Sequence, residues 1–100
     1  MLFVEFNDKR FYTVDEIDSY IERLSLWAIS AEGAKAGFPQ AVSLHTNLKN
    51  IDFMTIYGVM GEVDNDKIME DQRTLFHLKA KLQNRSVKDK ILAHIIDLFN

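Results

Sequence analysis

The spacing of apolar residues predicts a long helix in the first half of the chain. Between residues 17 and 31 they recur at steps of three and four, which is typical of the buried face of a helix. The members of this stripe are Ile17, Tyr20, Ile21, Leu24, Trp27, Ala28 and Ala31. Gly33, Gly37 and Pro39 follow the stripe and indicate where the helix ends.

A second helix is predicted at the end of the chain. Its apolar stripe consists of Val87, Ile91, Ile95 and Leu98, widened by Leu92 and Phe99. Capping residues support both helices, because Thr13 and Glu16 have the spacing of a capping box and Ser86 is a favourable N-cap. We expect the last helix to lie across a sheet and to close the core with its stripe.

Other segments alternate with the period of two that is typical of strands. "LFVEFNDKRFYTV" predicts two short strands around a turn at Asn7 to Arg10. "QAVSLHTNL" and "TLFHLKAKL" alternate between apolar and polar residues, as a strand with one wet face does. "NIDFMTIYGVMGEV" is apolar on both parities, which favours a central strand.

Together these elements predict a single α+β domain over residues 1–100. We expect a mostly antiparallel sheet of about five strands with two helices packed on one face, in the order ββαβββα. The length suits one domain with a sizeable core.

Composition narrows the function. The chain has no cysteine, which excludes disulfides, thiolate zinc sites and a cysteine nucleophile, and favours a reducing, cytoplasmic location. No segment has the pattern of a signal peptide or a membrane span. A net charge of -3 argues against broad nucleic-acid binding and favours a protein partner, in particular a basic one.

Two groups of residues are candidates for contact with that partner. The first is an acidic connection, predicted to be a loop, that contains Glu62, Asp64, Asp66, Glu70 and Asp71. It lacks the glycine that a calcium loop of the EF-hand type requires. The second is apolar and lies off the predicted core stripes: Leu26, Ile29 and Met60. Leu26 and Ile29 are open to two interpretations, deeper burial or a contact surface.

A basic strand face supports an alternative function. Arg73, His77, Lys79 and Lys81 share one parity of the predicted strand from Thr74 to Leu82. Such a face either keeps a sheet soluble or binds nucleic acid or another anionic ligand.

A small enzyme that uses His45 and His77 is a further alternative. The three histidines lack the short spacing of zinc signatures, and no serine lies in a nucleophile elbow. Glycine loops for phosphate binding are absent from the sequence as well. We therefore expect no catalytic residue, no metal and no cofactor.

The run from "FYTVDEIDSYIERL" through "FPQAVSLHTNL" to "DFMTIYGVMGEVDND" resembles Imm1-like bacterial toxin-immunity proteins. The resemblance covers Phe11 to Asp66 and implies a strand and a helix before a hairpin that ends in a glycine turn, Gly58 to Gly61. It also implies a non-enzymatic protein that blocks one cognate toxin.

The expected function is therefore that of a small acidic inhibitor that binds one cognate protein and occludes it. It would be an immunity-type protein, or a phage-encoded blocker of a nuclease or another basic nucleic-acid-processing protein. A homodimer is compatible with each of these functions, because paired apolar surfaces or strand edges can meet across a two-fold axis.

Overall fold

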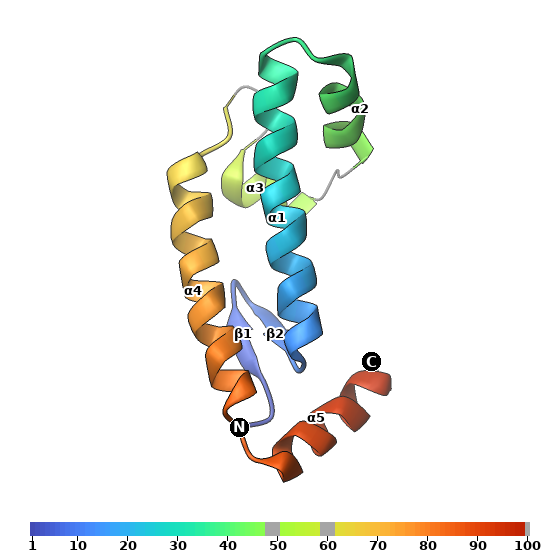
Figure 1. Cartoon of the computed structure of the whole chain (residues 1–100), viewed down its shortest axis with the longest axis vertical. Helices are drawn as coiled ribbons and strands as arrows, with labels where there is room; N and C mark the ends of the chain where they lie inside the picture. The colour runs from blue at the N-terminus through green and yellow to red at the C-terminus, as the bar shows by residue number, and fades with distance from the viewer. Residues whose placement is uncertain (48–50, 59–61, 100) are drawn as a thin grey trace. The chain divides into compact units, whose positions relative to one another are not determined.

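The chain is mostly helical in the computed structural model, which describes residues 1–47, 51–58 and 62–99 (Figure 1). Within these residues the elements are β1 (Val4–Phe6), β2 (Lys9–Phe11), α1 (Val14–Lys35), α2 (Pro39–Asn47), α3 (Ile51–Tyr57), α4 (Asn65–Gln83) and α5 (Val87–Leu98). The described sheet has two strands, β1 and β2. The expected α+β fold with five strands and two helices is therefore wrong, because the three strands predicted after α1 are helices.

The chain divides into two compact units. Unit 1 comprises Met1–Tyr20 and Gln72–Asn100, and unit 2 comprises Ile21–Asp71. Helices α1 and α4 each contribute residues to both units.

The β1–β2 hairpin of unit 1 confirms that two short strands begin the chain, but the turn is shorter than predicted, because Lys9 and Arg10 are paired residues of β2. Val4 pairs with Phe11 and Phe6 with Lys9 in an antiparallel register. Asn7 and Asp8 form the turn, and both have positive φ angles, 49° and 62°. Two left-handed residues in a row suit the twist of a two-residue hairpin, and asparagine and aspartate tolerate this conformation better than other non-glycine residues.

The start of α1 is fixed by the predicted capping pair. The Glu16 backbone N–H donates to Thr13 Oγ1 at 3.2 Å, and the Tyr12 backbone N–H donates to Glu16 Oε1 at 3.2 Å. Tyr20, two turns into the helix, packs edge-on against Phe11 with ring centroids 5.4 Å apart. The buried apolar residues of unit 1 are Val4, Phe11, Ile17, Tyr20, Leu75, Leu82 and Ala93.

The predicted strand from Thr74 to Leu82 is part of α4. Leu75 and Leu82 are fully buried, seven residues apart, whereas Phe76 is 55% exposed. In a helix, Phe76 and Ala80 lie on a different side from Leu78 and Leu82. The alternation in this segment therefore arises from two separate helical stripes, one buried and one exposed.

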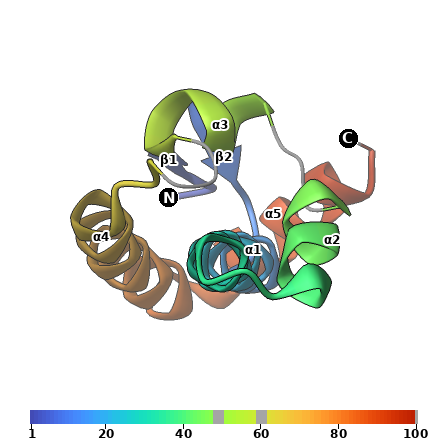
Figure 2. The same ribbon diagram turned by 90° about the horizontal axis from the view of Figure 1, so that it is seen from above.

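Unit 2 is built by α2 and α3 against the second half of α1 (Figures 1 and 2). α1 is followed by Gly37 in a left-handed conformation (φ 90°), and the Phe38 N–H donates to the Gly33 carbonyl at 3.0 Å. This bond satisfies a carbonyl that would otherwise lack a partner at the end of the helix. The chain then turns into α2, so the strand predicted from "QAVSLHTNL" is wrong.

The predicted central strand is also wrong, because its described part contains α3. Phe53 and Tyr57, one helical turn apart, are both buried, and their rings lie 6.0 Å apart. The Phe53 ring is 6.1 Å from Trp27 of α1. Residues 59–61 of this segment lie outside the described residues.

Helix α5 begins where the sequence predicts, but its apolar stripe does not close the core. Ser86 is the N-cap and its side chain accepts a hydrogen bond from the Asp89 N–H at 3.2 Å. The stripe residues expected to be buried are exposed: Val87, Ile91, Leu92, Ile95, Leu98 and Phe99. The buried position on this helix is Ala93 instead.

We expect Gly33→Ala to destabilise unit 2. A Cβ at Gly33 would lie 2.6 Å from the Ala41 Cβ, because α1 and α2 approach closely at this point. Alanine favours a helix by about 1 kcal/mol over glycine. Overpacking costs roughly 1–3 kcal/mol and so outweighs that gain. Urea unfolding followed by the fluorescence of Trp27, the chain's single tryptophan, measures the change.

The double variant Gly33→Ala/Ala41→Gly is the matched control, because it removes the methyl group that the new side chain meets. It should be more stable than Gly33→Ala alone. A Gly33→Ala variant more stable than the wild type would show that α2 does not approach α1 as described.

Candidate protein-binding surface

Unit 2 carries the negative charge of the chain. Its sequence has eight acidic and four basic residues, a formal charge of -4, whereas unit 1 has seven acidic and eight basic residues, a formal charge of +1. The two values add to the net charge of -3. A basic partner would therefore be attracted mainly to unit 2.

The start of α4 is tied to α1 within unit 2. Asp64 accepts a hydrogen bond from the Lys67 backbone N–H at 3.1 Å, as an N-cap residue does. The next residue, Asn65, donates from Nδ2 to Glu32 Oε1 at 2.8 Å. This bond places the first turn of α4 next to the face of α1 that carries Glu32.

Two exposed apolar side chains lie one helical turn from this hydrogen bond. Ile29 precedes Glu32 by three residues on α1 and is 65% exposed. Met69 follows Asn65 by four residues on α4 and is 53% exposed. Residues three or four apart share a helix face. Ile29 thus shares the face of α1 that carries Glu32, and Met69 the face of α4 that carries Asn65; we call these four residues the acidic-apolar patch.

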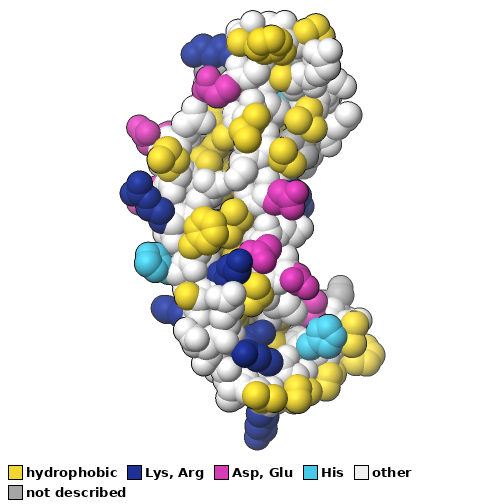
Figure 3. Space-filling model, viewed as in Figure 1, with side chains coloured by type: hydrophobic (Ala, Val, Ile, Leu, Met, Phe, Trp, Pro, Cys, Tyr) yellow, Lys and Arg dark blue, Asp and Glu magenta, His cyan; other side chains and the backbone are white. Residues whose placement is uncertain are grey.

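Exposed acidic side chains lie next to the α4 members of this patch along the chain. Asp66 and Glu70, two of the residues predicted to contact a partner, are exposed on α4. Glu62 and Asp64 are exposed just before the helix. Figure 3 shows hydrophobic and acidic side chains intermixed over the upper parts of α1 and α4. Beyond Asp64, therefore, the acidic connection is not a loop but the first two turns of α4.

The other predicted contact residues lie elsewhere. Asp71 is buried, and its carboxylate accepts a hydrogen bond from the Tyr57 hydroxyl at 2.7 Å. It therefore joins α3 to α4 inside unit 2. Leu26 is half-buried. Met60 lies outside the described residues.

The basic face on α4 keeps three of its four members. Arg73, His77 and Lys81 are exposed and follow one another at four-residue steps, so they share a face of the helix in unit 1. Lys79 lies on another side, where its Nζ is 2.7 Å from Asp18 Oδ1. The strand face predicted for these residues is wrong, but a shorter basic stripe remains.

His45 is buried in unit 2 rather than exposed on a strand. Its ring stacks on Trp27 with centroids 3.8 Å apart, and its Nδ1 is 2.7 Å from Ser30 Oγ. The Ser30 hydroxyl donates to the Trp27 carbonyl at 3.1 Å. Which of Ser30 Oγ and His45 Nδ1 donates in the bond between them depends on the tautomer of the His45 ring. Its Nε2 is buried without a hydrogen-bond partner among the described residues.

Ser30 and His45 are both buried, at 1% and 7% exposure, so this pair lies inside unit 2. His45 belongs to unit 2 and His77 to unit 1, so each is described by itself. No group of three or more metal-ligating side chains occurs among the described residues. In the same part of the chain, no helix is long and apolar enough to cross a membrane.

Three members of the acidic-apolar patch were not predicted from the sequence: Glu32, Asn65 and Met69. The pattern Asp64-Asn65-Asp66 before a possible helix was a signal for an N-terminus, because aspartate and asparagine are good caps. Met69 could then have been recognised as a residue off the core face. The bond between Asn65 and Glu32 joins residues 33 positions apart and has no local signal.

Comparison with known proteins found no match for this chain among protein-family models, curated proteins or solved structures.

The buried His45 should make the stability of unit 2 fall in mild acid. Burial lowers the pKa of His45 from its ordinary value of 6.5, and the Trp27 backbone carbonyl opposes this only in part. The unfolded chain therefore binds a proton at a higher pH than the folded chain does. Stability is complete above pH 6.5 and is lost as the pH falls below it, by about 1.4 kcal/mol per unit of pKa depression.

Urea unfolding between pH 7.5 and pH 5 tests this expectation, with His45→Gln as the variant. We expect this variant to lose stability at pH 7.5 and to show a weaker pH dependence than the wild type. His77→Gln and His94→Gln are matched controls, because both side chains are exposed. Glu16 acts in the opposite direction, since burial and the neighbouring Asp97 raise its pKa, but this effect is common to all four proteins. Equal slopes for wild type and His45→Gln would contradict the assignment.

Proposed function

We propose that this chain is a non-enzymatic protein-binding module that inhibits one cognate protein by occluding a basic surface of it. The observation that carries the proposal is the acidic-apolar patch of unit 2, in which Ile29 and Met69 are more than half exposed. Side chains of this kind act as anchors when a partner desolvates them.

The distribution of charge supports a basic partner. Exposed Asp66 and Glu70 flank one of the anchors, Met69, on α4. Glu32 is already hydrogen-bonded to Asn65, so it is held in place before a partner arrives. Acidic groups at the rim of an apolar contact steer a basic protein toward it and select against acidic competitors. A nuclease or another nucleic-acid-processing protein has a basic surface of this kind.

An immunity-type protein remains the most concrete form of this proposal. The hairpin implied by the resemblance to Imm1-like proteins falls on α2 and α3, so that part of the resemblance is wrong. The proposal rests instead on the exposed patch and the charge of unit 2. Occlusion requires no catalytic group from the inhibitor.

Affinity capture with two variants tests this function. The tagged chain would be exposed to a lysate of its native cells at low and high salt, and retained proteins identified by mass. We expect one stoichiometric protein on the wild type. Ile29→Ala/Met69→Ala should weaken its retention by roughly 10-fold to 100-fold, since an anchor residue is worth more than about 1 kcal/mol.

Phe76→Ala is the matched control, because Phe76 is as exposed as Met69 on the same helix but belongs to unit 1. It should retain the partner as the wild type does. Loss of the partner from Phe76→Ala and not from the double variant would contradict the proposal, as would a wild-type chain that retains no protein.

The basic stripe of α4 favours a second candidate function, the binding of nucleic acid or another anionic ligand. Arg73, His77 and Lys81 are exposed on one face. If nucleic acid is captured at low salt and released at high salt, this function is favoured over inhibition of a protein, because such binding depends steeply on salt.

A further inference from the structure

Helix α5 turns its apolar face toward solvent. Six large apolar side chains on this twelve-residue helix and its C-cap are 39% to 85% exposed. They are Val87, Ile91, Leu92, Ile95, Leu98 and Phe99. Figure 3 shows a row of hydrophobic atoms over α5. An amphipathic helix that packs on its own core shows the opposite arrangement.

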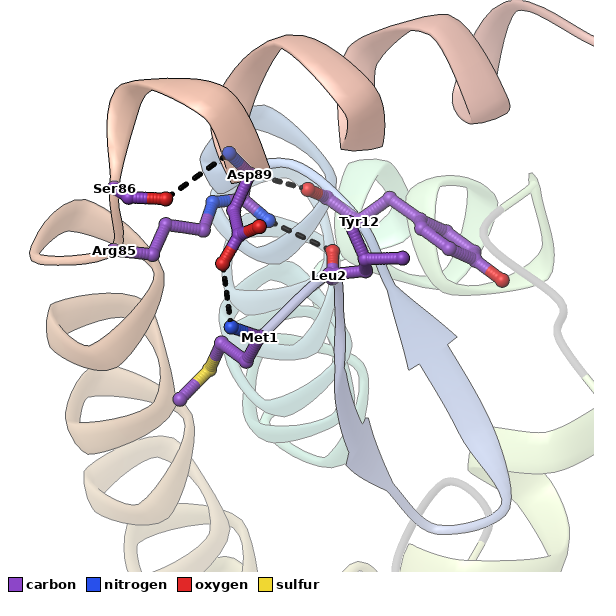
Figure 4. Close-up of polar contacts among 6 residues, drawn as sticks. All are labelled: Met1, Leu2, Tyr12, Arg85, Ser86 and Asp89. Atoms are coloured by element: carbon purple, nitrogen blue, oxygen red, sulfur yellow. Dashed lines mark hydrogen bonds and ion pairs between the residues drawn. The ribbon is translucent and has the colours of Figure 1, made fainter.

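Polar contacts hold the helix in this orientation (Figure 4). Asp89 Oδ2 is 2.7 Å from the Met1 amino group. Arg85, just before α5, donates from Nη1 to the Leu2 carbonyl at 2.8 Å and from Nη2 to the Tyr12 carbonyl at 2.7 Å. Ala93, a small residue on the side of α5 opposite the exposed stripe, is fully buried. Rotating α5 to bury its stripe would break the Asp89 contact and force large side chains into the space of Ala93.

The exposed face is large enough to form an interface. At these exposures the six side chains present on the order of 600 Å² of apolar area, at the upper end of what the largest patch of a typical monomer shows. A stable interface of standard size buries about 800 Å² on each partner. With the polar side chains at its rim, the α5 face supplies the area that a symmetric pair of copies needs.

The order of residues along α5 is suited to a copy of itself. In an antiparallel pair centred near Ala93, Ile91 of one copy meets Ile95 of the other, and the small Val87 meets the large Phe99. Lys88 lies within the exposed face. In the same arrangement it approaches the C-terminal end of the other α5, where the helix dipole is negative. Shape and charge are therefore both complementary.

We propose that α5 packs antiparallel against α5 of a second copy across a two-fold axis, and that the chain is a homodimer. A two-fold axis requires one surface that is complementary to itself, as this face is. The proposed dimer uses unit 1 and leaves the acidic-apolar patch of unit 2 for a different partner.

Sedimentation equilibrium of the full chain tests the proposal with two variants that carry opposite charges in the interface. At about 100 µM, where an interface of micromolar Kd is largely occupied, the wild type should have twice the monomer mass. Ile91→Lys and Ile95→Glu should each weaken the dimer by roughly 100-fold or more, because each buries charges without partners. An equimolar mixture of these two variants should regain the dimer mass. In an antiparallel pair the new lysine faces the new glutamate, and the remaining isoleucines face each other.

Several outcomes would overturn the proposal. A monomeric wild type does so, including one that sediments with vesicles of anionic phosphatidylserine, since α5 would then be a membrane-surface helix. Dimers that persist in both single variants also overturn it, as does a mixture that stays monomeric. Phe76→Glu, at an exposed apolar site on α4, is the matched control and should remain dimeric. Circular dichroism would establish that every variant keeps its helical content.

Discussion

Both units depend on one apolar stripe of α1. Ile17 and Tyr20 lie in the core of unit 1, whereas Leu24 and Trp27 lie in the core of unit 2. A 22-residue helix can supply two cores because its buried stripe continues from Ile17 to Ala31, over about four turns. The shortest elements of each unit are a hairpin of three-residue strands in unit 1, and helices of nine and seven residues in unit 2. Such elements are not stable alone and require a long helix to pack against.

Local signals in the sequence were sufficient for the hairpin, for α1 and for the start of α5. Thr13, Glu16 and Ser86 act through bonds to residues three or four positions away, so their effect is visible in a short window. The predictions of strands after α1 were wrong for a different reason. In α4, Leu78 and Leu82 face the core side while Phe76 and Ala80 fall on another side, and the two stripes together imitate alternation. Over nine residues, the alternation of a strand and a pair of interleaved helical stripes give the same sequence pattern. They can be distinguished only when it is known which side chains are buried.

The candidate surface was partly predictable. Ile29 could be identified because it lies off the stripe of a helix that the sequence predicts well. Asp66 and Glu70 were identified by charge alone, but charge does not distinguish an exposed acid from Asp71, which is buried against the Tyr57 hydroxyl. The difference between these acids is that Asp71 faces α3, which also packs through Phe53 near Trp27 of α1. Tertiary packing therefore decides which acidic residues a partner can reach.

The contrast between α1 and α5 explains why an apolar stripe does not predict its own environment. Both helices have an apolar stripe of helical spacing, and from the sequence both stripes are predicted to be buried. In α5, however, the side opposite the stripe carries Asp89, whose charge is paired with the Met1 amino group. It also carries Ala93, whose small side chain lets the helix approach the rest of unit 1 closely. Contacts on the polar side thus fix the helix, and the apolar side is left outward with its hydrophobic free energy still available. The exposed face is in this sense a consequence of how α5 is held, because the same contacts that attach it to unit 1 prevent it from burying its own stripe.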